Sequence, residues 1–298
     1  MRYTLRQLEV FLAVAHHESV SRAAEDLAMS QSAVSGALAD LERQFEIQLF
    51  ERLGKRVQLS GLGRSLRPRA QALLEQATEL ETGFRNQSAV GLVRVGATLS
   101  IGNYLMVPEI ARFMRENPGA RVTLDVANTA EIARKVLEFE IDIGLIEGEL
   151  HEPELEVTRW RPDELVVFCA PNHPFAKKRA LSDADLISAS WIVRESGSGT
   201  RQAFDRAMHG ILAELQIVLE LQHTEAIKSA VEAGLGVGCV SRIALEEAFQ
   251  YQTLVPCRVP QRDFHRSFYL VLRKQKYKSA GMLSLLEQFR AQGDAHLG

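Results

Sequence analysis

The sequence predicts an all-α N-terminal domain, a long linker helix and a C-terminal α/β domain of two lobes. Three observations lead to this prediction. Apolar residues follow a helical spacing over the first sixty residues, and an apolar repeat of the coiled-coil type follows from residue 61. From residue 92, short apolar strands alternate with helices, which is typical of mostly parallel α/β sheets. The length of 298 residues suits about two domains.

The N-terminal domain begins with short helices. Apolar residues three and four positions apart, from Leu5 onward, predict a first helix with Thr4 as its N-cap. A second helix is expected over residues 19–28, and a third over residues 31–42 with Ser30 as its N-cap. Two short helices joined by a tight turn are typical of a helix-turn-helix.

A basic hairpin is expected after these helices. Gly54 offers a turn, and apolar residues alternate with polar ones beyond it. The stretch 52–69 has six arginines and lysines and no acid, although the net charge of the chain is −3. Such residues can neutralise DNA phosphates, and a solvated charged surface is the alternative. The expected DNA-binding residues are Ser21, Gln31, Ser32, Ser35, Arg52, Lys55 and Arg56, although helix capping alone can explain Ser32.

The linker helix is predicted over residues 61–88. Its apolar residues are spaced alternately four and three positions apart, as in the seam of a coiled coil. A helix outside a compact domain cannot bury such a seam alone, so we expect a homodimer through this helix. Pro68 is expected to bend its start. The seam residues are Leu66, Ala70, Leu73, Ala77, Leu80 and Phe84.

A ligand cleft is expected in the α/β domain, where ligands lie at the C-terminal ends of strands and at helix N-termini. Three loops have this placement, at residues 98–103, 128–129 and 196–200. Their hydroxyls, N–H groups and glycines suit a small anion, whereas helix capping alone can explain any one of them. The expected effector-binding residues are Thr98, Ser100, Asn128, Thr129, Glu147, Ser198 and Thr200.

Glu147 stands out among these residues because it is a carboxylate at the end of a buried strand. A carboxylate repels a fully ionised ligand. It is instead expected to face a protonated acid, an ammonium group, or a nearby arginine such as Arg194 or Arg201. The sequence leaves these three alternatives open.

Several classes of protein are disfavoured by what the sequence lacks. It has no signal-peptide pattern and no apolar run of about 20 residues, so we expect a cytoplasmic protein that does not bind membranes. Three distant cysteines predict neither a disulfide framework nor a metal site. Without a nucleophile, phosphate-loop or zinc-protease motif, we expect no enzyme, catalytic residue or cofactor.

Several stretches match one family in order and spacing. In the N-terminal part these are residues 5–11, 19–27, 30–35, 41–42 and 49–52, and the match continues through 61–70. Residues 142–148 and 231–238 are typical of the effector domain of the same family. The chain resembles the LysR-type transcriptional regulators along essentially its whole length. The Gly-Asn-Tyr sequence at 102–104 and residues 194–201 are similar to those of members that respond to sulfur or nitrogen metabolites.

The resemblance implies a winged helix-turn-helix dimer, assembled as a dimer of dimers, with a C-terminal domain like a periplasmic binding protein. Its implied partners are operator double-stranded DNA and a small-molecule effector. Gly36 departs from the pattern, because many relatives have a larger polar or basic residue there. The expected domains are residues 1–60 for DNA binding, 61–91 for the linker helix and hinge, and 92–298 for the effector, with lobe I at about 92–161 and 267–298 and lobe II at about 162–266.

The predicted function is therefore a DNA-binding regulator that senses a small anion. Sulfur oxyanions, amino acids and organic acids are the candidate effectors. A periplasmic-type binding protein without DNA function is the main alternative, and an α/β enzyme is a third hypothesis.

Overall fold

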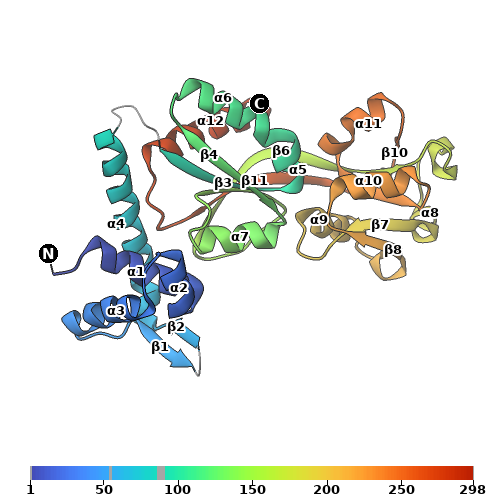
Figure 1. The fold of residues 1–298 in the computed structure, drawn as a ribbon. Coiled ribbons are helices and arrows are strands. Elements are labelled where there is room, and N and C mark those ends of the chain that lie inside the picture. Colours follow the sequence, from blue (N-terminus) through green and yellow to red (C-terminus); the bar gives the residue numbers. More distant parts are fainter. Residues whose placement is uncertain (1, 54–55, 86–90, 298) are drawn as a thin grey trace. The chain divides into compact units, whose positions relative to one another are not determined.

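The computed structural model describes residues 2–53, 56–85 and 91–297. It divides into two compact units (Figure 1). The N-terminal unit comprises residues 1–91 with 274–280, and the C-terminal unit comprises residues 92–273 with 281–298. Residues 274–280, which the sequence assigns to the C-terminal domain, thus belong by their contacts to the N-terminal unit. Within the described ranges, no helix combines the length and the apolar character needed to span a membrane.

Three helices, a hairpin and a long helix form the N-terminal unit. The predicted caps are present: the Thr4 side chain accepts from Gln7 N–H in a capping box, and Ser30 accepts from Ala33 N–H. Buried apolar residues from α1, α3 and α4 share one core, which includes Phe11 and Leu38. The elements are α1 (Leu5–His17), α2 (Val20–Asp26), α3 (Gln31–Phe45), the antiparallel pair β1 (Phe50–Leu53) and β2 (Arg56–Leu59), and α4 (Gly61–Arg85).

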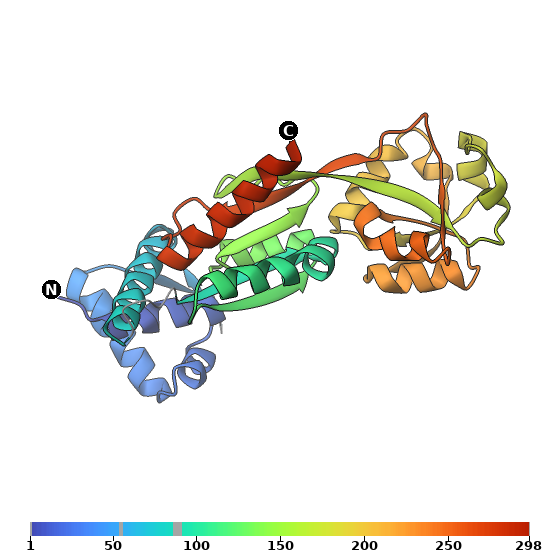
Figure 2. The ribbon, with the colours of Figure 1, turned by 90° about the horizontal axis from the view of Figure 1, so that it is seen from above.

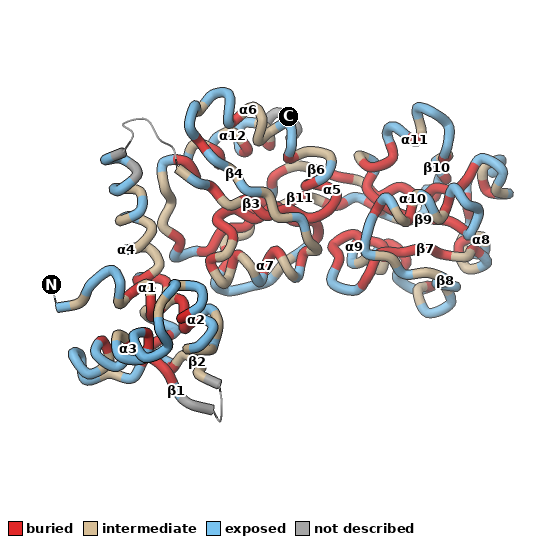
Figure 3. Tube along the Cα trace, viewed as in Figure 1, coloured by how far each residue is buried: buried red, intermediate tan, exposed pale blue. Residues whose placement is uncertain are grey.

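The linker helix α4 is 25 residues long and contains Pro68. Its predicted extension to residue 88 lies outside the described residues. The predicted seam is buried at its start, where Ala70 packs into the core, and exposed further along. Figure 3 shows this change from buried to exposed residues along α4.

The C-terminal unit is built on one mixed sheet of nine strands. Two long strands, β6 and β11, pair with each other and join the two lobes (Figure 2). The order is β4 (Arg121–Ala127), β3 (Leu92–Thr98), β5 (Ile143–Glu147), β11 (His265–Arg273), β6 (Leu155–Cys169), β9 (Val237–Ser241), β7 (Ser190–Arg194) and β8 (Gln216–Leu221), and β10 (Val255–Cys257) also pairs with β6.

The expectation of mostly parallel strands is wrong at the centre of this sheet. Strands β3, β4 and β5 are parallel in lobe I, and β7, β8 and β9 are parallel in lobe II, but β11 and β6 run antiparallel to their neighbours. The predicted strands at 165–170 and 268–272 are only parts of these two long strands. Strands β8 and β10 were not expected from the sequence.

Helices cover both lobes. Lobe I carries α5 (Leu99–Ile101), a π-helical turn (Gly102–Met106), α6 (Val107–Glu116), α7 (Thr129–Leu137) and α12 (Ala280–Leu297). Lobe II carries α8 (Asp183–Ser188), α9 (Gly199–Ala207), α10 (Thr224–Glu232), α11 (Glu246–Gln250) and 3₁₀ turns at Pro174–Lys177, Leu212–Glu214 and Arg242–Leu245. The helix expected from Asn103 therefore begins earlier, at Leu99. The three cysteines are buried free thiols.

Glycines let the two lobes approach each other at the end of β5. A Cβ atom on Gly199 would lie 2.0 Å from the carbonyl oxygen of Glu147, so no other residue fits there without movement. Gly148, the next residue after Glu147, has a positive φ of 80°. These glycines place the start of α9 in lobe II directly against the end of β5 in lobe I.

Candidate functional site

The exposed face of α3 carries the residues predicted to meet DNA. Val34, Leu38 and Leu41 point into the core, and Ser32 and Ser35 are exposed on the other side of the helix. Gln31 is exposed because it is the first residue of α3. The Gln31 side chain donates to Ser21 Oγ at 3.0 Å, so it links α3 to α2. Ser30 Oγ lies 3.0 Å from Ser32 Oγ. The start of α3 is thus a small polar surface, of the size that enters a major groove.

Gly36 follows these residues on the same face. A Cβ atom built there would meet no other atom within 4 Å. Packing within the chain therefore does not require glycine at this position. Because glycine has no side chain, no group projects from this part of the α3 surface.

The hairpin carries the other predicted DNA-binding residues. In the β1–β2 pair, Arg52 lies opposite Val57 and Arg56 lies opposite Leu53. The side chains of Arg52 and Arg56, and Lys55 as a whole, lie outside the described residues.

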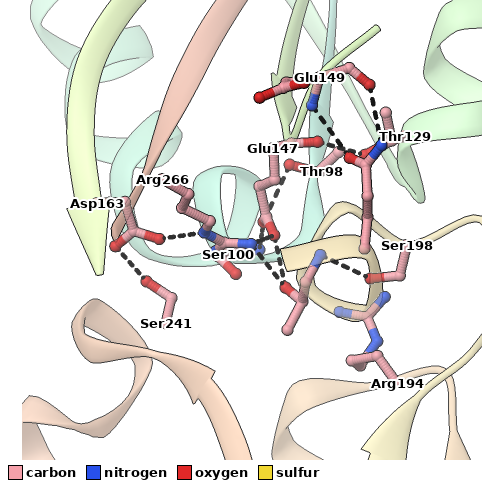
Figure 4. Close-up of polar contacts among 12 residues, drawn as sticks. Thr98, Ser100, Thr129, Glu147, Glu149, Asp163, Arg194, Ser198, Ser241 and Arg266 are labelled. Carbon is pink, nitrogen blue, oxygen red and sulfur yellow. Dashed lines mark hydrogen bonds and ion pairs between the residues drawn. The ribbon is translucent and has the colours of Figure 1, made fainter. Parts of the chain in front are cut away.

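In the C-terminal unit, four predicted residues meet at one point between the lobes (Figure 4). The Glu147 carboxylate accepts three hydrogen bonds there. Thr98 Oγ1 and the Ser100 N–H each donate to Oε1 at 3.0 Å, and Thr200 Oγ1 donates to Oε2 at 2.7 Å. All four residues are buried. The loop after β3 and the start of α9 therefore meet at the end of β5.

A buried arginine that the sequence did not single out completes this cluster. Arg266 Nη1 lies 2.8 Å from Glu147 Oε2 and donates to Thr200 Oγ1 at 3.0 Å. Its Nε donates to Asp163 at 2.6 Å, and Ser241 Oγ donates to the other oxygen of Asp163 at 2.7 Å. We call Glu147, Arg266, Asp163, Thr200 and their hydrogen-bond partners the Glu147 cluster.

The charge of Glu147 depends on these contacts. Burial alone would raise the pKa of this carboxyl, because a charged group is poorly solvated in the interior. The positive charge of Arg266, the hydrogen bonds from Thr200 and Ser100, and the charge of Arg194 outweigh burial and lower the pKa to about 2. Glu147 is therefore ionised at neutral pH.

Of the three alternatives for Glu147, the structure shows an arginine partner, but neither of the two arginines named from the sequence pairs with it. Arg194 Nε forms an ion pair with Glu195 at 2.7 Å. Arg201 is bound to Asp205 on the same helix and to Glu220 on β8. The nearest sequence signal for Arg266 is its position two residues before the predicted strand at 268–272.

The other predicted effector residues lie beside this cluster. Thr129 Oγ1 donates to the carbonyl oxygen of Glu147 at 2.9 Å. Asn128 and Ser198 are the N-caps of α7 and α9, so the capping explanation accounts for the hydrogen bonds that these two side chains make. A cavity of about 370 Å³ lies beside the cluster, and Thr129, Ser198 and Arg201 are among the residues that line it.

Two polar atoms of the Glu147 cluster have unused hydrogen-bonding capacity. Ser100 Oγ and Arg266 Nη2 are buried and have no hydrogen-bond partner within the described part of the chain. An unpartnered buried donor is costly, and an acceptor oxygen placed beside it would recover that cost. Both atoms lie in the cluster that the predicted effector loops form (Figure 4).

The chain matches two family models. Residues 5–64 match the bacterial regulatory helix-turn-helix protein model of the lysR family. Residues 86–294 match the LysR substrate binding domain. The matched regions thus include both the α3 surface and the Glu147 cluster.

Known proteins of similar sequence and structure agree with these matches. The uncharacterized HTH-type transcriptional regulator YeiE of Escherichia coli K12 is 43% identical over 287 residues, which are 96% of this chain and 97% of that protein. A full-length OxyR variant from Pseudomonas aeruginosa has a TM-score of 0.70 at 22% identity and covers 96% of this chain and 97% of its own. The CcmR regulatory domain of Synechocystis PCC6803, in complex with 2-PG, has a TM-score of 0.63 at 26% identity and covers 67% of this chain and 96% of its own.

The matched family and this relative are transcriptional regulators, which sets the enzyme hypothesis aside and favours a regulator over a binding protein without DNA function. The exposed polar face of α3 and the two-lobed domain with its interlobe cluster are the parts that such a regulator needs. The chain belongs to the LysR family of bacterial transcriptional regulators.

Proposed function

We propose that this regulator binds operator DNA with α3 and the β1–β2 hairpin, and that a small oxyanion at the Glu147 cluster controls the binding. The exposed start of α3 supports the DNA contact, because its hydroxyl and amide groups can read base edges in a major groove. The basic stretch 52–69 would neutralise phosphates beside that groove.

The arginines of the hairpin test the DNA contact. Changing Arg52 or Arg56 to alanine is expected to weaken binding to every DNA sequence. The salt slope of binding should fall by about one unit for each phosphate that the variant no longer neutralises. Fluorescence anisotropy at several salt concentrations measures both effects. Unchanged slopes in both variants would remove the hairpin from the interface.

Exposed apolar residues on α4 support a homodimer. Leu80 and Phe84 of the predicted seam are 59% and 79% exposed, and Leu73 is 42% exposed. An apolar cavity of about 510 Å³, bordered by α1, α3 and α4, continues this surface and includes Leu73 in its lining. Water contact with so much apolar surface is unfavourable, so a second copy of the chain is the occupant we infer. Two such dimers would form the dimer of dimers that the family resemblance implies, which is a homotetramer.

The effector is inferred to be a small oxyanion. Ser100 Oγ and Arg266 Nη2 are buried without a hydrogen-bond partner among the described residues. This observation supports an oxyanion, because both atoms can donate a hydrogen bond to a ligand oxygen. The ionised Glu147 disfavours a ligand of high negative charge and favours one that still carries a proton. The complex of the related CcmR domain with 2-PG is consistent with a small ligand in this domain.

Sulfite is a suitable probe for this proposal, because sulfur oxyanions are among the predicted effectors. Changing Ser100 to alanine removes a hydroxyl that has no partner within the described residues, so the fold should be unaffected. Sulfite affinity should fall about five- to thirtyfold, the size of one hydrogen bond to a charged group. Calorimetric titration into the full-length protein measures the change.

A matched serine provides the control. Ser188 is an exposed serine in lobe II, and its hydroxyl donates to the carbonyl oxygen of Asp185, three residues earlier. Its change to alanine should therefore leave sulfite affinity unaltered. Equal affinities of the wild type and the Ser100→Ala variant would contradict the assigned position of the ligand.

A further inference from the structure

A short segment of the chain leaves the C-terminal unit and binds the linker helix. This segment, Lys274–Ala280, follows β11 directly and precedes α12. Lys276 forms an ion pair with Glu75 on α4, and their side chains are only 3% and 18% exposed. A buried ion pair of this kind is specific in its geometry, because neither charge can be left without a partner. We call this segment the clip.

A second contact reinforces the ion pair. The Tyr277 hydroxyl donates to Glu79 Oε2 at 2.6 Å, and the Ala280 N–H donates to Glu79 Oε1 at 3.0 Å. Both oxygens of the Glu79 carboxylate are thus bound by the clip. Two neighbouring side chains of α4 are held by three groups from a segment about 200 residues away in the sequence.

The clip binds the side of α4 that does not carry the seam. Glu75 and Glu79 are four residues apart and share one face of the helix. Each follows a seam residue, Leu73 or Ala77, by two positions, which places it about 200° around the helix from the seam. The clip and a second copy of α4 can therefore bind the same helix at the same time.

A single strand connects the clip to the Glu147 cluster. Arg266, which binds Glu147 and Thr200, is the second residue of β11, and Arg273, the last residue of β11, directly precedes the clip. The strand is paired on both sides, with β5 and with β6. Arg273 is also anchored, with Nη1 donating to the Leu137 carbonyl and its guanidinium 4.5 Å from the Phe139 ring centre. The strand is thus a continuous, hydrogen-bonded connection between the Glu147 cluster and the clip.

We propose that the clip couples the Glu147 cluster to the linker helix, so that a change at the cluster alters α4 through β11. The proposal rests on the proposed function for the nature of the signal. Coupling of this kind is a free energy shared between two sites, and a double-mutant cycle measures it.

The test measures amide hydrogen exchange of α4, over residues 71–85, in the full-length protein. Thr200→Val perturbs the cluster, because it removes the hydrogen bonds of this hydroxyl to Glu147 and from Arg266. Thr98→Val, which removes one hydrogen bond to Glu147, is the milder second perturbation. Either change should alter exchange in α4 by about threefold or more when the clip is intact.

Breaking the clip should abolish this response. In a Lys276→Met background, the cluster variants should leave exchange in α4 unchanged, whereas a Lys274→Met background should preserve the response. Lys274 is the matched control, since it is an exposed lysine two residues before Lys276 in the same segment. Exchanging the two charges, in the variant Glu75→Lys with Lys276→Glu, should restore the response.

Two results would overturn the proposal. One is a response of α4 that persists in the Lys276→Met background. The other is no response of α4 to either cluster variant when both variants alter exchange around Glu147. The exchange test uses no effector, so a failure to bind sulfite would contradict only the effector assignment. Normal sulfite binding, together with an α4 response that persists in the Lys276→Met background, would contradict only the proposed role of the clip.

Discussion

Replacing Leu80 with aspartate is expected to dissociate the homodimer and to abolish tight operator binding. This residue is 59% exposed in the single chain, and the inferred partner helix would cover it. A carboxylate placed in that apolar seam loses its water without gaining a partner, which costs on the order of 3 kcal/mol or more. The dimer should weaken at least about a hundredfold. Light scattering coupled to size-exclusion chromatography measures the mass.

A charge on the other side of α4 is the control. Thr78 is exposed and lies two residues before Leu80, so it faces nearly the opposite side of the helix. Thr78→Asp should therefore leave the mass of the assembly unchanged. If Leu80→Asp and Leu73→Asp both retain the wild-type mass and DNA affinity, α4 is not the dimer seam.

The second large effect concerns acid stability. The pKa of Glu147 is about 2 in the folded protein, against an ordinary value of 4.5. A lowered pKa stabilises the fold above the unfolded value, and this contribution is lost as the pH falls from 4.5 towards 2. The full contribution is about 3 kcal/mol, and about 2 kcal/mol of it should disappear between pH 5 and pH 3.

Comparison with Glu147→Gln isolates this contribution, because other acidic residues destabilise both proteins alike at low pH. Glutamine has nearly the same shape and keeps an oxygen that accepts from Thr98 and Ser100, but it cannot lose a proton. Urea unfolding at several pH values should show that the difference in stability between the two proteins shrinks as the pH falls. A difference that stays constant from pH 7 to pH 3 would show that Glu147 is not held ionised by Arg266.

The sequence predicts local features of this fold well. Helix caps such as Thr4 and Ser30 depend on residues within one turn, and their hydrogen bonds form as expected. Thr98 and Ser100 lie beside Glu147 because β3 and β5 are parallel neighbours, whose C-terminal ends meet at one edge of the sheet. Thr200 reaches the same point from lobe II.

The long antiparallel strands β6 and β11 are the part of the fold that the sequence does not predict. The first ten residues of β6 are rich in charge and include Pro162, which argues against a strand. In the structure, this half of β6 pairs with β11 on one side only, while β9 pairs further along, so proline is tolerated at an edge. Arg266 was missed for a related reason, since a charged residue at a strand start has no local signal for burial. Its partners, Glu147 and Asp163, are more than 100 residues away.

The measurement that tests the central claim most directly is calorimetric titration of sulfite and of sulfate into the full-length wild type and the Glu147→Gln variant. At slightly acidic pH, where the titration is carried out, sulfite is mainly the singly charged hydrogen sulfite ion, whereas sulfate is fully ionised and would face the Glu147 carboxylate without a proton. The wild type should bind sulfite at least about tenfold more tightly than sulfate, and Glu147→Gln should remove this preference by strengthening sulfate binding. If the wild type binds neither anion, or if the preference survives in Glu147→Gln, a sulfur oxyanion held beside an ionised Glu147 is not the effector.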